Sequence, residues 1–189
     1  MGNPIALEAG CCYHIYNRGN NRENLFIQER NYAYFIKLWG KYISPVADTY
    51  AYCLLRNHFH VSVRVKKIQD LSGLLVSQHF SNLFNAYARA VNLATERTGA
   101  LFERPFERRL VGGDNYLARL IIYIHQNPQK HAFVQDFRDW PHSSYHELLA
   151  TDATWLQRDE VLALFGGKKT FLELHQEIQP LTTAEYEDE

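Results

Sequence analysis

The feature that most constrains the fold is the strict alternation of residues 58–65, HFHVSVRV. Apolar side chains occupy every second position, and histidine, serine and arginine occupy the positions between them. Successive side chains of a β-strand point to opposite faces, so this segment is predicted to be a strand with one face in the core. The opposite face carries both histidines, His58 and His60, and is therefore the candidate surface for a functional site.

The flanking sequence predicts a hairpin and a mixture of helices and strands. Residues 47–55 are rich in β-formers, and Arg56-Asn57 forms a short connection to the strand at 58–65. Helical spacing, turn residues and Gly/Pro punctuation define the other elements. These are strands over 11–17 and 101–111, and helices over 29–43, about 70–98 (closed by Gly99) and 115–126 (opened by Asp114), the last of which Pro128 is expected to end.

The resulting order β-α-β-β-α-β-α predicts an α+β protein. We expect a ferredoxin-like or RRM-like antiparallel sheet with helices on one face and an open face for a ligand. Residues 1–150 are predicted to form one catalytic domain, and residues 151–180 a C-terminal helical extension containing helices at 155–165 and 169–178. The acidic residues 181–189 are expected to be a disordered tail.

Composition favours a soluble cytoplasmic protein with one core. A chain of 189 residues with 46% hydrophobic content buries one sizeable core and leaves little room for a second. Three cysteines are an odd number, which argues against a disulfide framework. The sequence shows no secretory start and no apolar run of membrane-spanning length, so no membrane partner is expected.

Charge alone does not identify a DNA-binding protein. The net charge is −1, and because residues 181–189 carry four acids and no base, the remaining residues sum to +3. Arginines mixed with aromatic residues suit a nucleic-acid strand with accessible bases, although a solvated surface is the simpler interpretation. The candidate DNA-binding residues are Arg18, Arg22, Arg104, Arg108 and Arg109.

Two groups of residues suggest a metal site and a nucleophile. His58 and His60 lie two residues apart, so on a strand they point at the same ion, although such pairs are commonly just polar surface. Tyr123 and Asn127 lie four residues apart and share a helix face. Tyr123 could equally be a core aromatic, and Pro128 is expected to push the backbone of Asn127 out of the helix.

Taken together, the motifs resemble the single-tyrosine HUH transposases. The resemblance starts at YHIYNRG (13–19), includes NHFH (57–60) and GALFERPF (99–106), and continues through YIHQNP (123–128) and DWPHSSY (139–145). It is nearest to the REP-associated tyrosine transposases. Each motif is weak alone, but their order and spacing are specific.

The resemblance implies that Tyr123 is the nucleophile and that His58, His60 and Asn127 hold Mg²⁺ or Mn²⁺. Such enzymes nick single-stranded or hairpin DNA, form a 5′-phosphotyrosine and then transfer the strand. This chain departs from the family pattern in having Arg56 in the usual proline position. It also has Gln126, which competes with Asn127 as third ligand. His14, His125 and His131 are further candidates for metal or phosphate contact, with structural histidines as the simpler interpretation.

Two other functions remain open at this point. A non-catalytic nucleic-acid binding module could use Tyr50, Tyr52 and Phe102 to stack bases on an RRM-like sheet. A metal-dependent phosphohydrolase would use water in place of tyrosine. The chain is expected to act as a monomer or homodimer, and Gly112-Gly113 is a possible hinge through which two copies exchange their catalytic helices.

Overall fold

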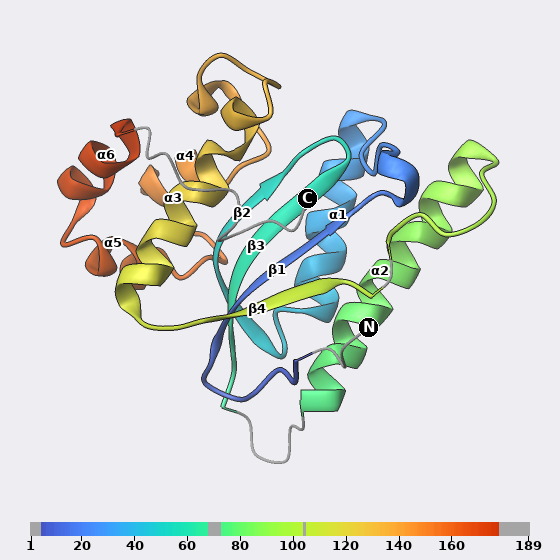
Figure 1. The fold of residues 1–189 in the computed structure, drawn as a ribbon, viewed down its shortest axis with the longest axis horizontal. Coiled ribbons are helices and arrows are strands. Elements are labelled where there is room, and N and C mark those ends of the chain that lie inside the picture. Colours follow the sequence, from blue (N-terminus) through green and yellow to red (C-terminus); the bar gives the residue numbers. More distant parts are fainter. Residues whose placement is uncertain (1–4, 68–72, 104, 178–189) are drawn as a thin grey trace.

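The computed structural model describes residues 5–67, 73–103 and 105–177. Four strands and two long helices form the first half of the chain and alternate in the predicted order (Figure 1). The elements are β1 (Cys12–Arg18), η1 (Asn20–Arg22), α1 (Glu29–Tyr42), β2 (Ala47–Leu54), β3 (His58–Val65), α2 (Gly73–Thr95), β4 (Glu107–Val111), α3 (Asp114–Lys130), η2 (Phe137–Asp139), α4 (Tyr145–Leu149), α5 (Arg158–Leu164) and α6 (Lys168–Gln176).

The four strands form one antiparallel sheet in the order β2-β3-β1-β4. This order is that of a ferredoxin-like sheet, and the predicted α+β class is confirmed. Strand β3 has the predicted bounds and lies between β2 and β1. The register pairs Tyr16 with His60 and Arg18 with His58, so β1 and β3 present a shared polar face.

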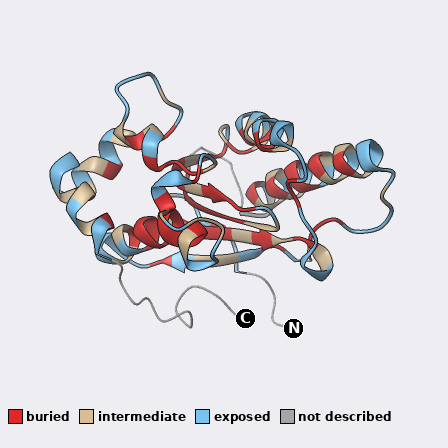
Figure 2. Ribbon diagram, turned by 90° about the horizontal axis from the view of Figure 1, so that it is seen from above, coloured by how far each residue is buried: buried red, intermediate tan, exposed pale blue. Residues whose placement is uncertain are grey.

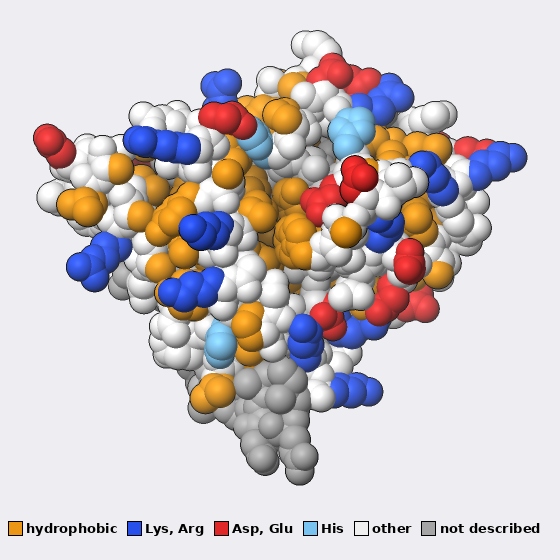
Figure 3. Space-filling model, turned by 180° about the vertical axis from the view of Figure 1, so that it is seen from behind, with side chains coloured by type: hydrophobic (Ala, Val, Ile, Leu, Met, Phe, Trp, Pro, Cys, Tyr) orange, Lys and Arg blue, Asp and Glu red, His pale blue; other side chains and the backbone are white. Residues whose placement is uncertain are grey.

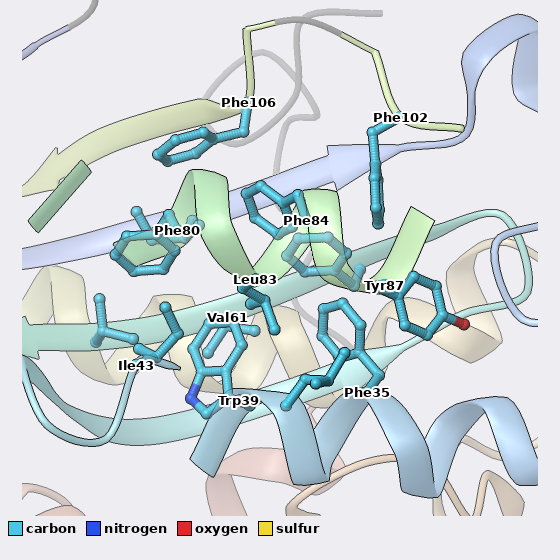
Figure 4. Packing of buried hydrophobic residues seen from close by; sticks show 14 of the residues in the cluster. Phe35, Trp39, Ile43, Val61, Phe80, Leu83, Phe84, Tyr87, Phe102 and Phe106 are labelled. Carbon is cyan, nitrogen blue, oxygen red and sulfur yellow. The ribbon is translucent and has the colours of Figure 1, made fainter. Parts of the chain in front are cut away.

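Helices α1 and α2 cover the apolar face of the sheet, as predicted. The apolar residues of α1 recur at helical spacing, which puts Tyr32, Phe35 and Trp39 on one buried stripe. The indole nitrogen of Trp39 donates a 3.0 Å hydrogen bond to Thr49 Oγ1 and ties α1 to β2. Aromatic rings fill this layer (Figure 4), with Phe80, Phe84 and Phe106 among those packed between α2 and the strands.

A second hydrophobic cluster forms on the opposite side of β2. Helix α3 packs there with α4, α5 and α6, and its middle turns are buried (Figures 1 and 2). Tyr50 and Cys53 of β2 belong to this cluster. The second face of the sheet is therefore covered near β2, and the polar face of β1 and β3 lies beside α3. The helical extension predicted for residues 151–180 contains α5 and α6, while residues 181–189 lie outside the described residues.

Two predicted boundaries were wrong. Helix α3 does not end before Pro128 but continues to Lys130, because three contacts hold its last turn. His131 N–H donates to Asn127 O at 3.0 Å, Phe133 N–H to Pro128 O at 2.9 Å, and Phe137 N–H to Gln129 Oε1 at 3.1 Å. The strand predicted at 101–111 begins only at Glu107, and Phe102 contributes an isolated bridge to Gly19 instead.

Among the described residues, no helix combines the length and apolar character needed to cross a membrane.

Candidate active site

The two histidines of β3 lie on the polar face, as the alternation predicted. His58 Nδ1 lies 2.8 Å from Asn57 Oδ1, and His58 Nε2 lies 3.2 Å from Asn127 Oδ1 on α3. The rings of His58 and His60 meet edge to face, with centroids 5.2 Å apart. A strand and a helix that are distant in sequence therefore bring two imidazoles and one amide together.

His60 is buried and shares a hydrogen bond with a third histidine. Its Nδ1 lies 2.9 Å from Nε2 of His14 on β1, and the two side chains are 2% and 0% exposed. Burial holds the pKa of His60 well below its ordinary value, and the neighbouring His14, His58, His131 and Arg18 lower that pKa further. His60 is therefore neutral near pH 7, which is the protonation state required of a metal ligand.

Tyr123 projects from α3 towards the same histidines. Its ring lies edge-on to His60 with centroids 5.5 Å apart, and edge-on to His14 at 6.1 Å. The ammonium nitrogen of Lys130 lies 4.7 Å from the centre of the Tyr123 ring. Because α3 continues through Pro128, Tyr123 and Asn127 stay one helical turn apart and face the histidines together.

The side chains of Asn127 and Gln126 face in different directions. Gln126 Nε2 donates to the carbonyl oxygens of His175 and Glu177, at 3.0 and 3.2 Å, so it is turned to α6. Asn127 is fully buried and its oxygen faces His58. The expectation that Pro128 displaces Asn127 from the helix is wrong, and of these two side chains Asn127 is the one whose oxygen faces His58.

Comparison with known proteins agrees with the resemblance to REP-associated tyrosine transposases. The chain is 29% identical over 104 residues to the "Putative REP-associated tyrosine transposase" of Haemophilus influenzae, a match that covers 52% of this chain and 59% of the relative. A solved structure described as a REP-associated tyrosine transposase bound to a REP hairpin superposes with a TM-score of 0.64. It is 18% identical, and the match covers 80% of this chain and 86% of that one. The predicted resemblance is confirmed.

The matched stretch of the transposase relative is less than two thirds of that protein's length. No family model matches the chain. The superposition shows the shared fold, while the roles of individual residues have to be argued from the geometry of this site.

Two of the arginines predicted to bind DNA, Arg18 and Arg109, border the histidines of this site. Arg18 lies on the histidine face, with its Nε 3.5 Å from a carboxylate oxygen of Glu103. Arg109 pairs with His14 across the sheet and donates through Nε to Tyr16 Oη at 3.1 Å. Tyr16 in turn stacks on His60, with centroids 5.7 Å apart.

Of the other three predicted arginines, Arg108 is not on this face. Arg108 points to the opposite side of the sheet, where its Nη1 donates to Ser77 of α2 at 2.8 Å. Arg22 is exposed in η1, and Arg104 lies outside the described residues. On the side turned away in Figure 1, Lys and Arg side chains of the described residues lie over one half of the surface, and most Asp and Glu side chains lie over the other half, around a central apolar area (Figure 3).

Sequence reasoning gave too little weight to His14 and Tyr16. Both alternate with the buried Tyr13 and Ile15 along β1, so the same period that identified His58 and His60 also places them on the polar face. His131 contacts His58, with ring centroids 4.8 Å apart. His125 has the structural role expected of it, since it is fully buried between His175 and Ser144.

The aromatic side chains proposed as a base-stacking platform are not available on the sheet surface. Tyr50 is 2% exposed and donates its hydroxyl to Glu160 at 2.6 Å, while Phe102 is 6% exposed inside the core. Tyr52 stacks on Trp155. The structure therefore gives no support to an RRM-like binding module that uses these three rings.

The donor atoms fit a divalent cation. Asn57 Oδ1 can only accept, so the proton of a neutral His58 belongs on Nδ1. Nε2 of His58 and Oδ1 of Asn127 lie 3.2 Å apart, close enough for one cation to be bound by both atoms. Two neutral nitrogens and one amide oxygen suit an open Mg²⁺ or Mn²⁺ site better than a closed zinc site. No group of three His, Cys, Asp or Glu side chains among the described residues offers an alternative.

Proposed function

We propose that this chain is a metal-dependent transposase that nicks single-stranded or hairpin DNA and transfers the strand through a 5′-phosphotyrosine. This proposal rests on the contact between helix α3 and strand β3. Tyr123 lies beside His60, and Asn127 beside His58, with a ring-centroid distance of 5.5 Å and an atomic distance of 3.2 Å respectively. A nucleophile and a set of metal ligands are thus supplied by one chain.

In this reaction the phenolic oxygen of Tyr123 attacks the scissile phosphorus. The phenol gives up its proton as the new bond joins tyrosine to the 5′ side of the break, the phosphorus–O3′ bond breaks, and the leaving 3′ oxygen takes up a proton to become a hydroxyl. A bound Mg²⁺ or Mn²⁺ ion supplies positive charge that stabilises the charge developing on the phosphate oxygens. One phosphodiester replaces another, so a second 3′-hydroxyl can reverse the attack and join strands without ATP.

The residues of the chain position this chemistry. His58, His60 and Asn127 are the proposed ligands, and burial keeps His60 neutral for that role. A tyrosine phenol ordinarily has a pKa near 10, so it attacks at neutral pH only with local electrostatic help. The Lys130 ammonium over the Tyr123 ring adds a positive charge on that side of the phenol.

The test is covalent capture of labelled hairpin DNA in the presence of Mn²⁺. On a denaturing gel, wild-type protein should give a band shifted by the attached DNA. Tyr123→Phe keeps the ring and its packing but lacks the attacking oxygen, so it should bind the hairpin and give no shifted band. His58→Ala/His60→Ala should also give none, and a chelator should abolish the wild-type band.

Two tyrosine variants serve as matched controls. Tyr16→Phe removes the other phenol beside His60, and Tyr116→Phe removes a phenol two helical turns before Tyr123 on α3. Both should retain the covalent band. A band that persists in Tyr123→Phe and disappears in either control would assign the nucleophile to the other tyrosine.

We further propose that the preferred substrate is a hairpin with single-stranded flanks. Support comes from the REP hairpin named in the description of the solved relative and from arginine side chains mixed with aromatic rings at Arg109 and Tyr16. Hairpins should bind more tightly than fully paired duplex of equal length at matched salt. Tighter binding of duplex would contradict this substrate assignment.

A further inference from the structure

The last described helix, α6, is attached to α3 immediately beside the proposed metal ligand. His125 Nδ1 lies 2.8 Å from His175 Nε2, and Gln126 donates to the backbone carbonyls of His175 and Glu177. The side chains of His125, Gln126 and His175 are at most 3% exposed. Two consecutive residues of α3 are therefore held by α6, and the next residue is Asn127.

The hydrogen bonds through His175 form a directed chain. His175 Nδ1 lies 2.7 Å from the carbonyl oxygen of Phe171, which can only accept, so Nδ1 carries the proton and Nε2 accepts. His125 must then donate from Nδ1 and accept at Nε2. Ser144 Oγ lies 2.8 Å from that nitrogen, accepts the backbone N–H of Tyr52 at 2.8 Å and lies 3.2 Å from the Tyr52 carbonyl oxygen. The hydrogen bond between α6 and α3 therefore runs from His125 to His175, and Ser144 connects His125 to β2.

Helix α3 needs such support at this point because of Pro128. Proline has no N–H, so one backbone hydrogen bond of the helix is lost one residue after Asn127. The rotation and height of this turn therefore depend on contacts from outside the helix. A displacement of about 1 Å is enough to impair catalysis when a reacting group or ligand is misplaced.

We propose that α6, through His175, is a positioning element of the active site that holds Asn127 and Tyr123 at the histidine pair. This inference rests on the function proposed above for those residues. His175 touches neither the proposed nucleophile nor the proposed ligands, so it is a positioning residue. Partners in the outer shell of a metal site commonly change metal affinity or activity by about 10- to 100-fold when they are replaced.

The test compares two replacements of His175 in the full chain. Gln places an amide oxygen near the position of Nε2, so His175→Gln keeps an acceptor for His125. His175→Phe keeps the buried ring and removes both nitrogens. Lys169→Ala, on an exposed part of α6, is the control for general damage to this helix. Thermal unfolding identifies a temperature at which all variants are folded, and the measurements are made there.

His175→Phe should lower kcat for hairpin cleavage at least 10-fold, leave KM for DNA nearly unchanged and weaken Mn²⁺ binding by a similar factor. His175→Gln should recover most of each loss, and Lys169→Ala should match wild type. Equal losses in His175→Phe and His175→Gln would mean that packing, and not the directed hydrogen bond, matters. Wild-type kinetics and Mn²⁺ affinity in His175→Phe would overturn the proposal.

A crystal structure of His175→Phe tests positioning independently of the proposed reaction. The distance from Asn127 Oδ1 to His58 Nε2, 3.2 Å in the wild-type chain, should lengthen or the amide should rotate. An unchanged site would overturn the positioning role whatever the cleavage assay shows. Conversely, a displaced Asn127 in a protein whose wild type never forms a covalent band would support the positioning role and reject the transposase function.

Discussion

Two glycine-to-alanine substitutions should change stability in opposite directions although the chemical change is the same. Gly19 follows β1 and donates its N–H to the carbonyl oxygen of Asn57, the residue before His58, at 2.8 Å. Its φ of −66° and ψ of 136° suit any residue, so backbone strain does not require glycine there. What requires it is space, because a Cβ on Gly19 would lie 1.9 Å from the carbonyl oxygen of Glu23.

A contact of 1.9 Å cannot be relieved by a side-chain rotation, because the oxygen belongs to the backbone. The loop from Asn20 to Glu23 must move by more than 1 Å, which strains the Gly19–Asn57 hydrogen bond. Overpacking costs about 1–3 kcal/mol and a lost hydrogen bond about 0.5–1.5 kcal/mol, so Gly19→Ala should cost about 2–4 kcal/mol. Gly40, in contrast, lies in α1 with nothing within 4 Å of an added Cβ, and Gly40→Ala should add about 0.5–1 kcal/mol.

Equilibrium unfolding in urea, followed by far-ultraviolet circular dichroism, measures both changes. With a slope of about 1–3 kcal/mol per molar urea, the midpoint of Gly19→Ala should fall by about 1 M or more while that of Gly40→Ala rises slightly. Gly19→Ala should also weaken Mn²⁺ binding, because Asn57 fixes the start of β3. A Gly19→Ala midpoint at or above that of wild type would refute the steric reasoning, and a loss in Gly40→Ala would refute the helix estimate.

Two further predictions concern the site and its support. A mixture of Tyr123→Phe with His60→Ala should remain inactive, because one chain supplies both groups; restored covalent capture would instead show that copies exchange α3 through Gly112-Gly113. Burial lowers the pKa of His175 from 6.5 to about 4. As the pH drops from about 6.5 to 4, the His175 side chain is protonated in the unfolded chain before it is protonated in the folded chain. The free energy of unfolding should therefore fall over this range, by up to about 3 kcal/mol. His175→Gln should flatten the pH dependence of urea midpoints over that range, and an unchanged slope would contradict the assignment.

The sheet could be predicted because its signals are local. The alternation over 58–65 requires a strand with two different faces, and the preceding apolar run with Arg56-Asn57 requires a hairpin. The helical spacing over 29–43 likewise predicted α1, while only the structure shows that its buried face is formed by Tyr32, Phe35, Leu38 and Trp39. Each of these patterns repeats over several residues, so one residue that departs from it does not change the predicted element.

The errors occurred where a distant part of the chain decided the outcome. Pro128 disfavours a helix on local grounds, but the contacts of the last turn with 131–137 and the burial around it keep α3 intact. Arg108 and Arg109 look equivalent in sequence. Alternation along a strand puts them on opposite faces, but only their partners in β1, Ile15 and His14, show that Arg109 is the one on the histidine face.

The consecutive buried polar residues His125, Gln126 and Asn127 of α3 differ in how their hydrogen-bonding groups are satisfied. All three side chains are at most 3% exposed, and burial of polar groups is costly unless hydrogen bonds replace water. His125 is satisfied at both nitrogens, and Gln126 donates twice to α6. Gln126 Oε1 and Asn127 Nδ2 each meet no hydrogen-bond partner among the described residues, and Asn127 differs in that its oxygen faces a histidine nitrogen.

A helix selected only for stability would gain from an apolar residue at position 127, since the incompletely satisfied amide costs about 1–3 kcal/mol there. Replacement by Leu should therefore abolish Mn²⁺ binding and covalent capture without comparable loss of stability, and Asn127→Leu should be as stable as wild type or more so. Gln126→Leu should lower stability, because it leaves the backbone carbonyls of His175 and Glu177 without their donor, and it should weaken Mn²⁺ binding less than Asn127→Leu does because Asn127 itself remains. If Asn127→Leu unfolds more easily and still captures DNA, Asn127 serves the fold and the metal site must be sought elsewhere.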